Sequence, residues 1–339
     1  MPAAPLRILL VRFSAIGDVL LTTPLIRALR SRYPWAYLAA ATKRPLAPLL
    51  THNPHLDAVL ALEPSEDLRD LADRIRKTRF THLLDLHGNL RTAALRLMVP
   101  GQWRGYPHFR AARRRLVRRK EDRYPAGTPP VAERYFQAAA GLDIVPDGGP
   151  PEFGLDAREI AWARTWLGIR HLGMRRRLVV VAPGATHATK RWPIEAWKAL
   201  VADLTARDRD VVVLGGPEDR DLAQAISAVG GERAASAAGE ASLQGTGGLL
   251  SASTVAAAGD TGVMHMATGV GIPVVALFGP TVRHFGFTPY RARAIILERE
   301  LDCRPCSYHG GPDCPLGHHR CLRDILPTEV AAALESLGG

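Results

Sequence analysis

A carboxylate follows the first apolar run of the chain. Residues 8–13 are typical of a strand, and Ser14-Ala15-Ile16-Gly17-Asp18 leads directly into a helix-like run. Asp18 can cap the start of that helix, because its charge complements the positive end of the helix dipole. The same carboxylate can instead belong to a functional site, because it stands where a nucleotide-binding strand–helix unit would hold a phosphate. Taken alone, this stretch fits both roles.

Three later loops combine cations, hydroxyls and glycines in a way that suits a diphosphate. Residues 182–193 place threonines and two cations just ahead of a helix, and residues 259–265 open another helix whose N–H groups can bind an anion. Residues 214–219 place paired glycines before an acid that can bind a ribose. Each loop alone is also typical of an ordinary strand-to-helix turn. A further loop, residues 278–281, adds a hydroxyl and a close backbone approach. The candidate residues are Thr186, Lys190, Glu218, Asp260, Thr261, Gly262 and His265.

The cysteines of the chain are clustered near its end. They follow the spacing C-x2-C-x7-C-x6-C within residues 303–321, here called the cysteine segment. Such clustering favours a structural knuckle, with zinc as the candidate metal. The later spacings are irregular for a zinc knuckle, so free thiols are the alternative. The four residues are Cys303, Cys306, Cys314 and Cys321.

Positive charge is concentrated in one segment. The formal net charge is +11, and residues 101–125 contain nine lysines and arginines against two acids. Such a patch favours one anionic partner, although a solvated basic loop is the alternative. Trp103, Tyr106 and Phe109 can contribute to binding there or to core packing. Because the charge is confined to this segment and no recognised nucleic-acid motif is present, we expect no nucleic-acid partner.

Apolar runs alternate with helical periods in both halves of the chain. Pro24 either kinks the first helix or lies in the first turn of a second piece capped by Thr23. Strands separated by helices pair in parallel, so the pattern predicts two Rossmann-like halves in tandem. Strands are expected at 8–13, 37–41, 58–62, 82–86, 178–182, 210–214, 254–258 and 273–278, and helices at 18–32, 67–77, 131–141, 194–207 and 218–229.

Length and composition fit a globular α/β protein. With 339 residues, 47% of them hydrophobic and 23% charged, we expect two domains of about 150 residues each. No stretch approaches the roughly 20 apolar residues of a membrane-spanning helix. The start of the chain lacks a signal-peptide pattern, so we expect a cytoplasmic location.

The ordered combination of these stretches resembles glycosyltransferase family nine, the ADP-heptose:lipopolysaccharide heptosyltransferases. The resemblance covers almost the whole chain, including the cysteine segment. It implies an α/β GT-B architecture, in which two Rossmann-like, doubly wound parallel-sheet domains face a central cleft. The acceptor-binding domain would be residues 1–155 and the nucleotide-sugar-binding domain residues 156–339, with a final helix that can pack back on the first. The stretches that carry it are VRFSAIGDVLLTTPLIRALRSRYP, APGATHATKRWP, LGGPEDRDLA, GDTGVMHMATGVGIPVVALFGPT and CRPC…CPLGHHRCL.

The resemblance implies transfer of heptose from ADP-heptose to the lipopolysaccharide inner core, with inversion at the anomeric carbon. The acceptor would be Kdo-lipid A or heptosyl-Kdo-lipid A, and Asp18 the general base. Lys190 and the helix that opens at Gly262 would neutralise the leaving ADP, so we expect no cofactor for catalysis. An inverting transferase of another nucleotide-linked sugar, acting on a different cell-surface glycan, is the alternative.

The resemblance also suggests where an anionic acceptor would bind. Phosphorylated lipid A with acidic Kdo sugars would suit the basic segment, as would the inner leaflet of the inner membrane. We therefore expect a cytoplasmic protein peripherally associated with that membrane. The candidate acceptor-binding residues are Ser14, Gly17, His87, Asn89, Arg91, Arg113 and Arg114.

Overall fold

The computed structural model describes residues 5–338, and its residue contacts divide the chain into two compact units. The first unit contains the residues up to His108 together with Pro129–Gly154. The second contains Phe109–Thr128 and the residues from Leu155 onward. Residues 109–128, assigned by the sequence to the N-terminal domain, therefore group with the second unit. The periodicity of the sequence does not reveal this grouping, because the grouping depends on contacts between residues far apart in the chain.

The first unit is built on a parallel sheet with strand order β3-β2-β1-β4-β5. Helices α3 and α4 bury Leu71, Ile75 and Leu95 against one face of this sheet. The strands are β1 (Arg7–Val11), β2 (Tyr37–Lys43), β3 (Ala58–Leu62), β4 (His82–Asp85) and β5 (Trp103–Gly105). The helices are α1 (Ile16–Leu20), α2 (Thr23–Arg32), α3 (Leu68–Thr78), α4 (Leu90–Met98) and α6 (Val131–Arg134), with 3-10 turns η1 (Arg44–Leu49) and η2 (Tyr135–Ala139).

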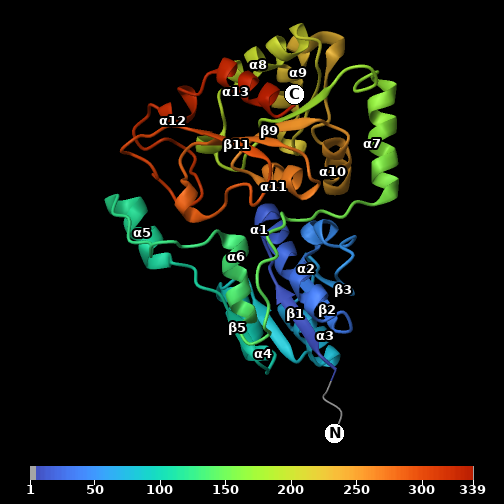
Figure 1. Ribbon diagram of the computed structural model, residues 1–339, viewed down its shortest axis with the longest axis vertical. Coiled ribbons are helices and arrows are strands. Elements are labelled where there is room, and N and C mark those ends of the chain that lie inside the picture. Colours follow the sequence, from blue (N-terminus) through green and yellow to red (C-terminus); the bar gives the residue numbers. More distant parts are fainter. Residues whose placement is uncertain (1–4, 339) are drawn as a thin grey trace. The chain divides into compact units, whose positions relative to one another are not determined.

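The second unit has a parallel sheet with strand order β11-β10-β9-β6-β7-β8. Figure 1 shows α8, α9 and α13 on one side of this sheet and α10 and α11 on the other. The strands are β6 (Leu178–Ala182), β7 (Asp210–Val213), β8 (Ala234–Ser236), β9 (Val255–Gly259), β10 (Val274–Phe278) and β11 (Ala294–Glu298). The helices are α5 (Arg110–Arg119), α7 (Ala157–Ile169), α8 (Ile194–Ala206), α9 (Arg220–Ser227), α10 (Leu243–Ser251), α11 (Gly262–Gly269), α12 (Arg320–Arg323) and α13 (Pro327–Ser336), with 3-10 turns η3 (Ala188–Lys190), η4 (Pro217–Asp219), η5 (Ala228–Arg233) and η6 (Arg283–Phe285).

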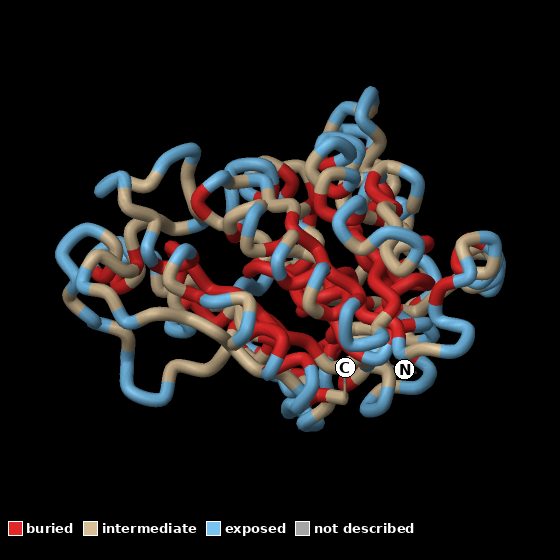
Figure 2. Tube along the Cα trace, turned by 90° about the horizontal axis from the view of Figure 1, so that it is seen from above, coloured by how far each residue is buried: buried red, intermediate tan, exposed pale blue. Residues whose placement is uncertain are grey.

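Local sequence explains most of these elements. The strands β6, β7, β9 and β10 are buried at every position, as expected for strands covered on both faces. Figure 2 shows buried residues as long continuous stretches of the chain trace. The predicted first helix is divided into α1 and α2. The second piece has Pro24 in its first turn, as one alternative predicted, but Thr22 rather than Thr23 is its N-cap.

The final helix, α13, is part of the second unit. It packs there against α8, β9 and β10. Its apolar face supplies Val330 and Leu334 to the core of the second unit. Burial of these side chains, roughly 2 kcal/mol for each, holds the helix there.

Both sheets have a topological switch point, where the strand order reverses. In the first unit it lies between β1 and β4, and in the second between β6 and β9. Ligands of open parallel sheets bind beyond the carboxyl ends of the strands at such points. Within residues 5–338, every helix is too short or too polar to cross a lipid bilayer.

Candidate functional site

Arg12 and Asp18 form an ion pair at the switch point of the first unit. Arg12 Nη2 lies 2.5 Å from Asp18 Oδ1, and the two side chains are 13% and 17% exposed. Arg12 Nε donates to the Ser14 carbonyl at 2.7 Å, and Nη1 donates to the Leu86 carbonyl at 2.6 Å. Because Ser14 follows β1 and Leu86 follows β4, the guanidinium connects both loops and holds Asp18 between them.

Asp18 also belongs to the start of α1. Its Oδ2 accepts a hydrogen bond at 3.1 Å from the backbone N–H of Ala15, the N-cap residue of the helix. The predicted N-cap role of Asp18 is therefore wrong, because Ala15 is the N-cap and Asp18 is the third residue of α1, whose carboxylate bonds the backbone of the N-cap residue as in a capping box. Since its two oxygens have different partners, the carboxylate is held in one orientation. Capping fixes the position of a carboxylate that could act as a base.

His87 is an uncharged ring at the same switch point. Burial, together with the nearby Arg12 charge, lowers the pKa of His87 to about 4. Its Nδ1 accepts a hydrogen bond at 3.2 Å from the backbone N–H of Phe13. A neutral imidazole with Nδ1 as acceptor carries its proton on Nε2. His87 can thus donate a hydrogen bond to an acceptor molecule, but it does not supply a positive charge at neutral pH.

The other acceptor-side candidates of the first unit lie in the same loops. Ser14 and Gly17 belong to the turn into α1, and Gly17 is buried there. Asn89 is the N-cap of α4, and its side chain accepts a backbone N–H of the first turn at 3.1 Å. Arg91 is exposed, with its guanidinium 5.9 Å from the centroid of the Phe13 ring. Asn89 thus has a structural role, whereas Arg91 presents charge at the surface.

Lys190 and Asp260 form a corresponding pair at the switch point of the second unit. Lys190 Nζ lies 2.7 Å from Asp260 Oδ2 and 3.0 Å from the Asp260 carbonyl oxygen. The Thr281 hydroxyl donates to the same Oδ2 at 2.6 Å. The loops after β6, β9 and β10 therefore meet at one buried carboxylate. These contacts use two of the three ammonium donors of Lys190, so one is left for a ligand.

The N-terminus of α11 lies directly beyond Asp260. Thr261 is its N-cap and Gly262 its first residue. The Thr261 hydroxyl oxygen is buried and has no hydrogen-bond partner among residues 5–338. An unpaired buried hydroxyl costs free energy, so a ligand that bonds it gains affinity. His265 is 3% exposed and lies one turn further into α11. A helix N-terminus beside a lysine is suited to bind an anion.

Asp219 joins the loops after β6 and β7. It is 6% exposed and accepts a hydrogen bond from Gly216 N at 3.1 Å. A Cβ atom on Gly184 would lie 2.1 Å from Asp219 Oδ2, so the close approach of the two loops requires glycine. Glu218 precedes Asp219 in η4, and Thr186 is exposed in the loop after β6. The candidate donor residues thus lie on loops, or in the helical turns that follow them, at the carboxyl end of one sheet.

The basic helix α5 contacts the cysteine segment. Arg113 donates to the Tyr308 carbonyl, and its guanidinium lies 4.6 Å from the centroid of the Phe285 ring. Lys120 Nζ donates to the Pro305 carbonyl at 2.6 Å. Arg113 therefore anchors the helix, whereas Arg114 is exposed. The two acceptor candidates of this segment have different environments.

The thiols of the cysteine segment are near one another. Burial, together with the neighbouring thiols, raises the pKa of Cys306, and the same causes raise the pKa of Cys321 to about 11. The four cysteines form no disulfide. In the described part of the chain, no three His, Cys, Asp or Glu side chains are arranged as ligands of one metal ion. The thiols thus lie near one another, as the sequence spacing suggested, but among the described residues they are not arranged as ligands of one metal ion.

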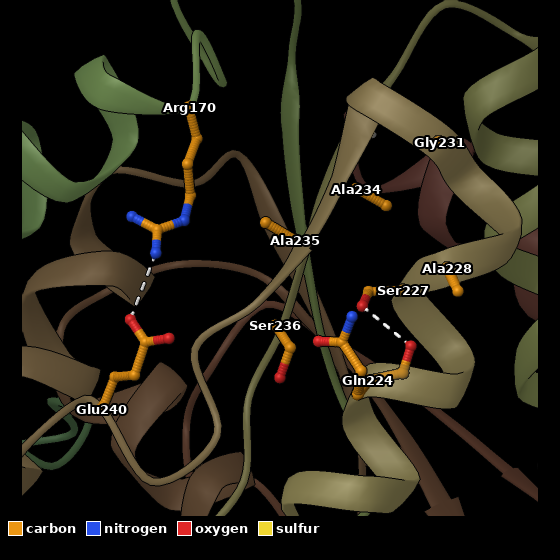
Figure 3. Close-up of a pocket in the computed structure, with 9 residues that line it drawn as sticks. All are labelled: Arg170, Gln224, Ser227, Ala228, Gly231, Ala234, Ala235, Ser236 and Glu240. Atoms are coloured by element: carbon orange, nitrogen blue, oxygen red, sulfur yellow. Dashed lines mark hydrogen bonds and ion pairs between the residues drawn. The ribbon is translucent and has the colours of Figure 1, made fainter.

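A polar pocket of about 280 Å³ lies beside β8, at the edge of the second sheet (Figure 3). Arg170 and Glu240 form an ion pair there at 3.3 Å, and Gln224, Ser227 and Ser236 complete the polar part of the lining. None of the candidate donor residues lines it. This pocket is therefore separate from the cluster around Lys190.

Two residues of these clusters, Arg12 and Asp219, were not selected from the sequence, whereas the hydroxyl of Thr281 was noted there without a partner. Arg12 comes just after a buried strand, which was a usable signal because such a position reaches the carboxyl edge of a sheet. Asp219 is next to Glu218, and only its burial distinguishes it. Their partners are distant in sequence, so their importance depends on the folded contacts.

Comparison with known proteins places this geometry in a family. The family model for glycosyltransferase family 9 (heptosyltransferase) matches residues 68–312. Lipopolysaccharide heptosyltransferase 2 of Salmonella typhimurium is 27% identical, over 98% of both chains. A family 9 glycosyltransferase from Veillonella parvula superposes with a TM-score of 0.80 at 22% identity, covering 99% of this chain and 98% of that one. The E. coli heptosyltransferase WaaC, solved with ADP, superposes with a TM-score of 0.72 at 16% identity, covering 98% and 100%. These neighbours share the GT-B fold, which confirms the predicted fold class, and the chain belongs to glycosyltransferase family 9, the heptosyltransferase family.

Proposed function

We propose that this protein transfers heptose from ADP-heptose to a hydroxyl of the lipopolysaccharide inner core, with inversion at the anomeric carbon. The acceptor hydroxyl oxygen bonds to the anomeric carbon while the bond from that carbon to the ADP oxygen breaks. Asp18 takes the hydroxyl proton, and ADP leaves with the bonding electron pair. Donor binding is assigned to the second unit and proton removal to the first.

The observation that carries the proposal is the cluster of Lys190, Thr261 and the α11 N-terminus. A lysine donor, a buried hydroxyl without a partner and the first N–H groups of a helix are found together at one switch point. Each favours a phosphate oxygen, and their fixed dipoles stabilise the charge that develops on the leaving ADP. Thr186, in the loop that leads to Lys190, and His265, in the first turns of α11, are assigned to the same diphosphate, and Glu218 is assigned to the adenosine.

The role of Asp18 as the base rests on its fixed orientation. Arg12 and the Ala15 N–H hold the two carboxylate oxygens. Arg12 keeps its positive charge, because Asp18 raises the pKa of Arg12 even though burial opposes that charge. A carboxylate held by a cation stays ionised, as a base must at neutral pH. His87 and Arg91 are assigned to the acceptor.

The exposed face of α5 is assigned to an anionic membrane surface. Arg110, Arg114, Arg115, Arg118 and Arg119 are exposed along this helix. Juxtamembrane basic residues gain roughly 1 kcal/mol each from anionic lipids at the cytoplasmic leaflet. We therefore propose that the protein associates peripherally with the inner membrane and binds its lipid-linked acceptor there.

Zinc at the cysteine segment stays a prediction. The thiols are neighbours, but no three are arranged as ligands within residues 5–338. Metal analysis of the purified protein and of a Cys321→Ser variant tests it. About one zinc per wild-type chain, lost in the variant, supports a structural site, and a metal-free wild-type protein excludes it.

The function is tested by a donor and acceptor screen. Purified protein is incubated with ADP-heptose, and separately with ADP-, UDP- and GDP-hexoses, in the presence of Kdo-lipid A or heptosyl-Kdo-lipid A. The proposal expects ADP release and a heptosylated product only with ADP-heptose, with the anomeric configuration opposite to that of the donor by NMR. Preference for another sugar nucleotide would support the alternative transferase, and a product that retains the donor configuration would contradict the role of Asp18.

A further inference from the structure

We propose that the cysteine segment is a positioning element of the donor site, in which Gly311 and His319 hold Thr189 so that the adjacent Lys190 is directed at Asp260. The inference rests on the proposed function, because it concerns the same ADP site. It assigns a role to a segment that the transfer chemistry does not use.

Thr189 is bonded to the cysteine segment through each of its polar atoms. Its backbone N–H and its Oγ1 both donate to the Gly311 carbonyl at 3.1 Å, and Oγ1 accepts from Gly311 N at 2.8 Å. His319 Nε2 lies 2.8 Å from the Thr189 carbonyl oxygen. Because a carbonyl only accepts, His319 must carry a proton on Nε2. Thr189 is 4% exposed, so these bonds are shielded from water.

Lys190 follows Thr189 directly, so the position of its backbone depends on these bonds. The only residues of η3 are Ala188, Thr189 and Lys190, a turn too short to be rigid by itself. The Lys190 side chain nevertheless meets Asp260 at 2.7 Å. We attribute this alignment to the attachment of Thr189 to Gly311 and His319.

The same segment holds the second loop that reaches Asp260. Arg304 donates to the carbonyls of Gly279 and Thr281 at 2.6 and 2.7 Å, and Cys306 N donates to the Pro280 carbonyl at 3.2 Å. All three consecutive carbonyls of this loop are therefore bonded to the cysteine segment. Thr281 in turn donates its hydroxyl to Asp260. Both donors to the Asp260 side chain, Lys190 and Thr281, thus come from loops held by one segment.

The thiols are connected to the residues that hold these two loops. The backbone N–H of His319 lies 3.4 Å from Cys314 Sγ, so one cysteine bonds the residue that holds Thr189. His319 is also the N-cap of α12, whose Leu322 is buried against Gly279. His319 and Arg304 thus lie in the same segment as the thiols, and the backbone of His319 contacts one thiol directly. The segment therefore connects the thiols to the proposed diphosphate site.

Matched variants at His319 test the proposal. His319→Met removes the donor at nearly constant size, whereas His319→Gln keeps an N–H donor at a similar reach. We expect His319→Met to raise the dissociation constant of ADP, measured by calorimetry, and the KM for ADP-heptose by roughly fivefold or more, the loss expected for one buried hydrogen bond. The kcat at saturating donor should change much less, and His319→Gln should recover most of the affinity.

A second pair of variants covers the case in which His319→Met does not fold. Thr189→Val removes the hydroxyl that Gly311 bonds and keeps the shape of the side chain, while Thr189→Ser keeps the hydroxyl. Weaker ADP binding in the valine variant than in the serine variant supports the proposal. Wild-type affinity in His319→Met or in Thr189→Val, or equal loss in the glutamine and methionine variants, overturns it. A wild-type protein that does not bind ADP overturns the proposed function, and this inference with it.

Discussion

Arg12 Nη2 lies 2.5 Å from Asp18 Oδ1, so the proposed base is ion-paired with a residue of its own unit. The second unit repeats this arrangement, since Lys190 is paired with Asp260 at its own switch point. In both places a cation and a carboxylate join loops that follow neighbouring strands. In each unit, therefore, an ion pair connects the loops that carry the proposed site residues.

Arg12 is expected to position Asp18. Arg12→Met removes the ion pair and the hydrogen bonds to Ser14 and Leu86. We expect kcat to fall by roughly tenfold or more, since loss of orientation weakens general-base catalysis, which itself contributes about 10²–10⁴-fold. Affinity for ADP should be unchanged, because Lys190 and α11 are intact. Steady-state kinetics and calorimetry measure the two quantities.

Arg12→Lys is the control for this prediction. It keeps a charge near Asp18 but loses the forked contacts, so its kcat should lie between those of the wild type and Arg12→Met. Asp18→Asn sets the lower limit for loss of the base. An Asp18→Asn enzyme with wild-type turnover would remove Asp18 from the mechanism, whatever the Arg12 variants do.

Lys190 is expected to bind the donor diphosphate. Lys190→Ala should raise the dissociation constant of ADP by roughly tenfold or more, as for loss of one charge-assisted hydrogen bond. Lys198→Ala is the matched control, because Lys198 pairs with Glu195 on α8 of the same unit. Calorimetry with ADP compares the two. Equal ADP affinity in both variants would contradict the diphosphate role.

His87 is expected to make stability depend on pH. The pKa of His87 is lowered from 6.5 to about 4 in the folded protein, chiefly by burial. Between these values the unfolded chain binds a proton that the folded protein does not, so the free energy of unfolding falls as the pH is lowered through this range. His87→Asn keeps an acceptor for the Phe13 N–H but does not titrate.

Urea unfolding at pH 7 and pH 5 measures this effect. The wild type should lose more stability between the two pH values than His87→Asn, because other titrating groups contribute equally to both proteins. The same loss in wild type and variant would show that His87 is not the group responsible.

Exposed arginines of α5 are expected to bind anionic lipid. Arg114→Gln/Arg118→Gln should weaken binding to vesicles of mixed phosphatidylcholine and phosphatidylglycerol by about thirtyfold at low salt, because each of the two lost charges contributes about 1 kcal/mol. Arg158→Gln/Arg164→Gln removes two exposed charges of helix α7 and is the matched control. Vesicle co-sedimentation measures both. If both double variants lose binding equally, net charge rather than α5 determines membrane affinity.

Much of the fold could be predicted from local sequence. Periodicity located β3 and β6 with the bounds that the structure gives, and most other predicted strands within one or two residues. The elements β5, β8, α5, β11, α4 and α7 were not predicted. The strands β5 and β8 are only three residues long, and α5 carries few apolar residues, so none of these three elements shows a periodic apolar pattern. Contacts with Tyr308 and Phe285, remote in sequence, stabilise α5 instead.

The sequence by itself determined which loops carry chemistry, because a carboxylate, lysine or helix N-terminus after an apolar run lies at the carboxyl edge of a parallel sheet. It identified Asp18, Lys190 and Asp260 in this way. Only the tertiary structure decided their partners, since Arg12 bonds Leu86, Thr281 bonds Asp260 and His319 bonds Thr189 across long separations. Strand order creates these contacts, and strand order depends on packing of the whole chain rather than on any local pattern.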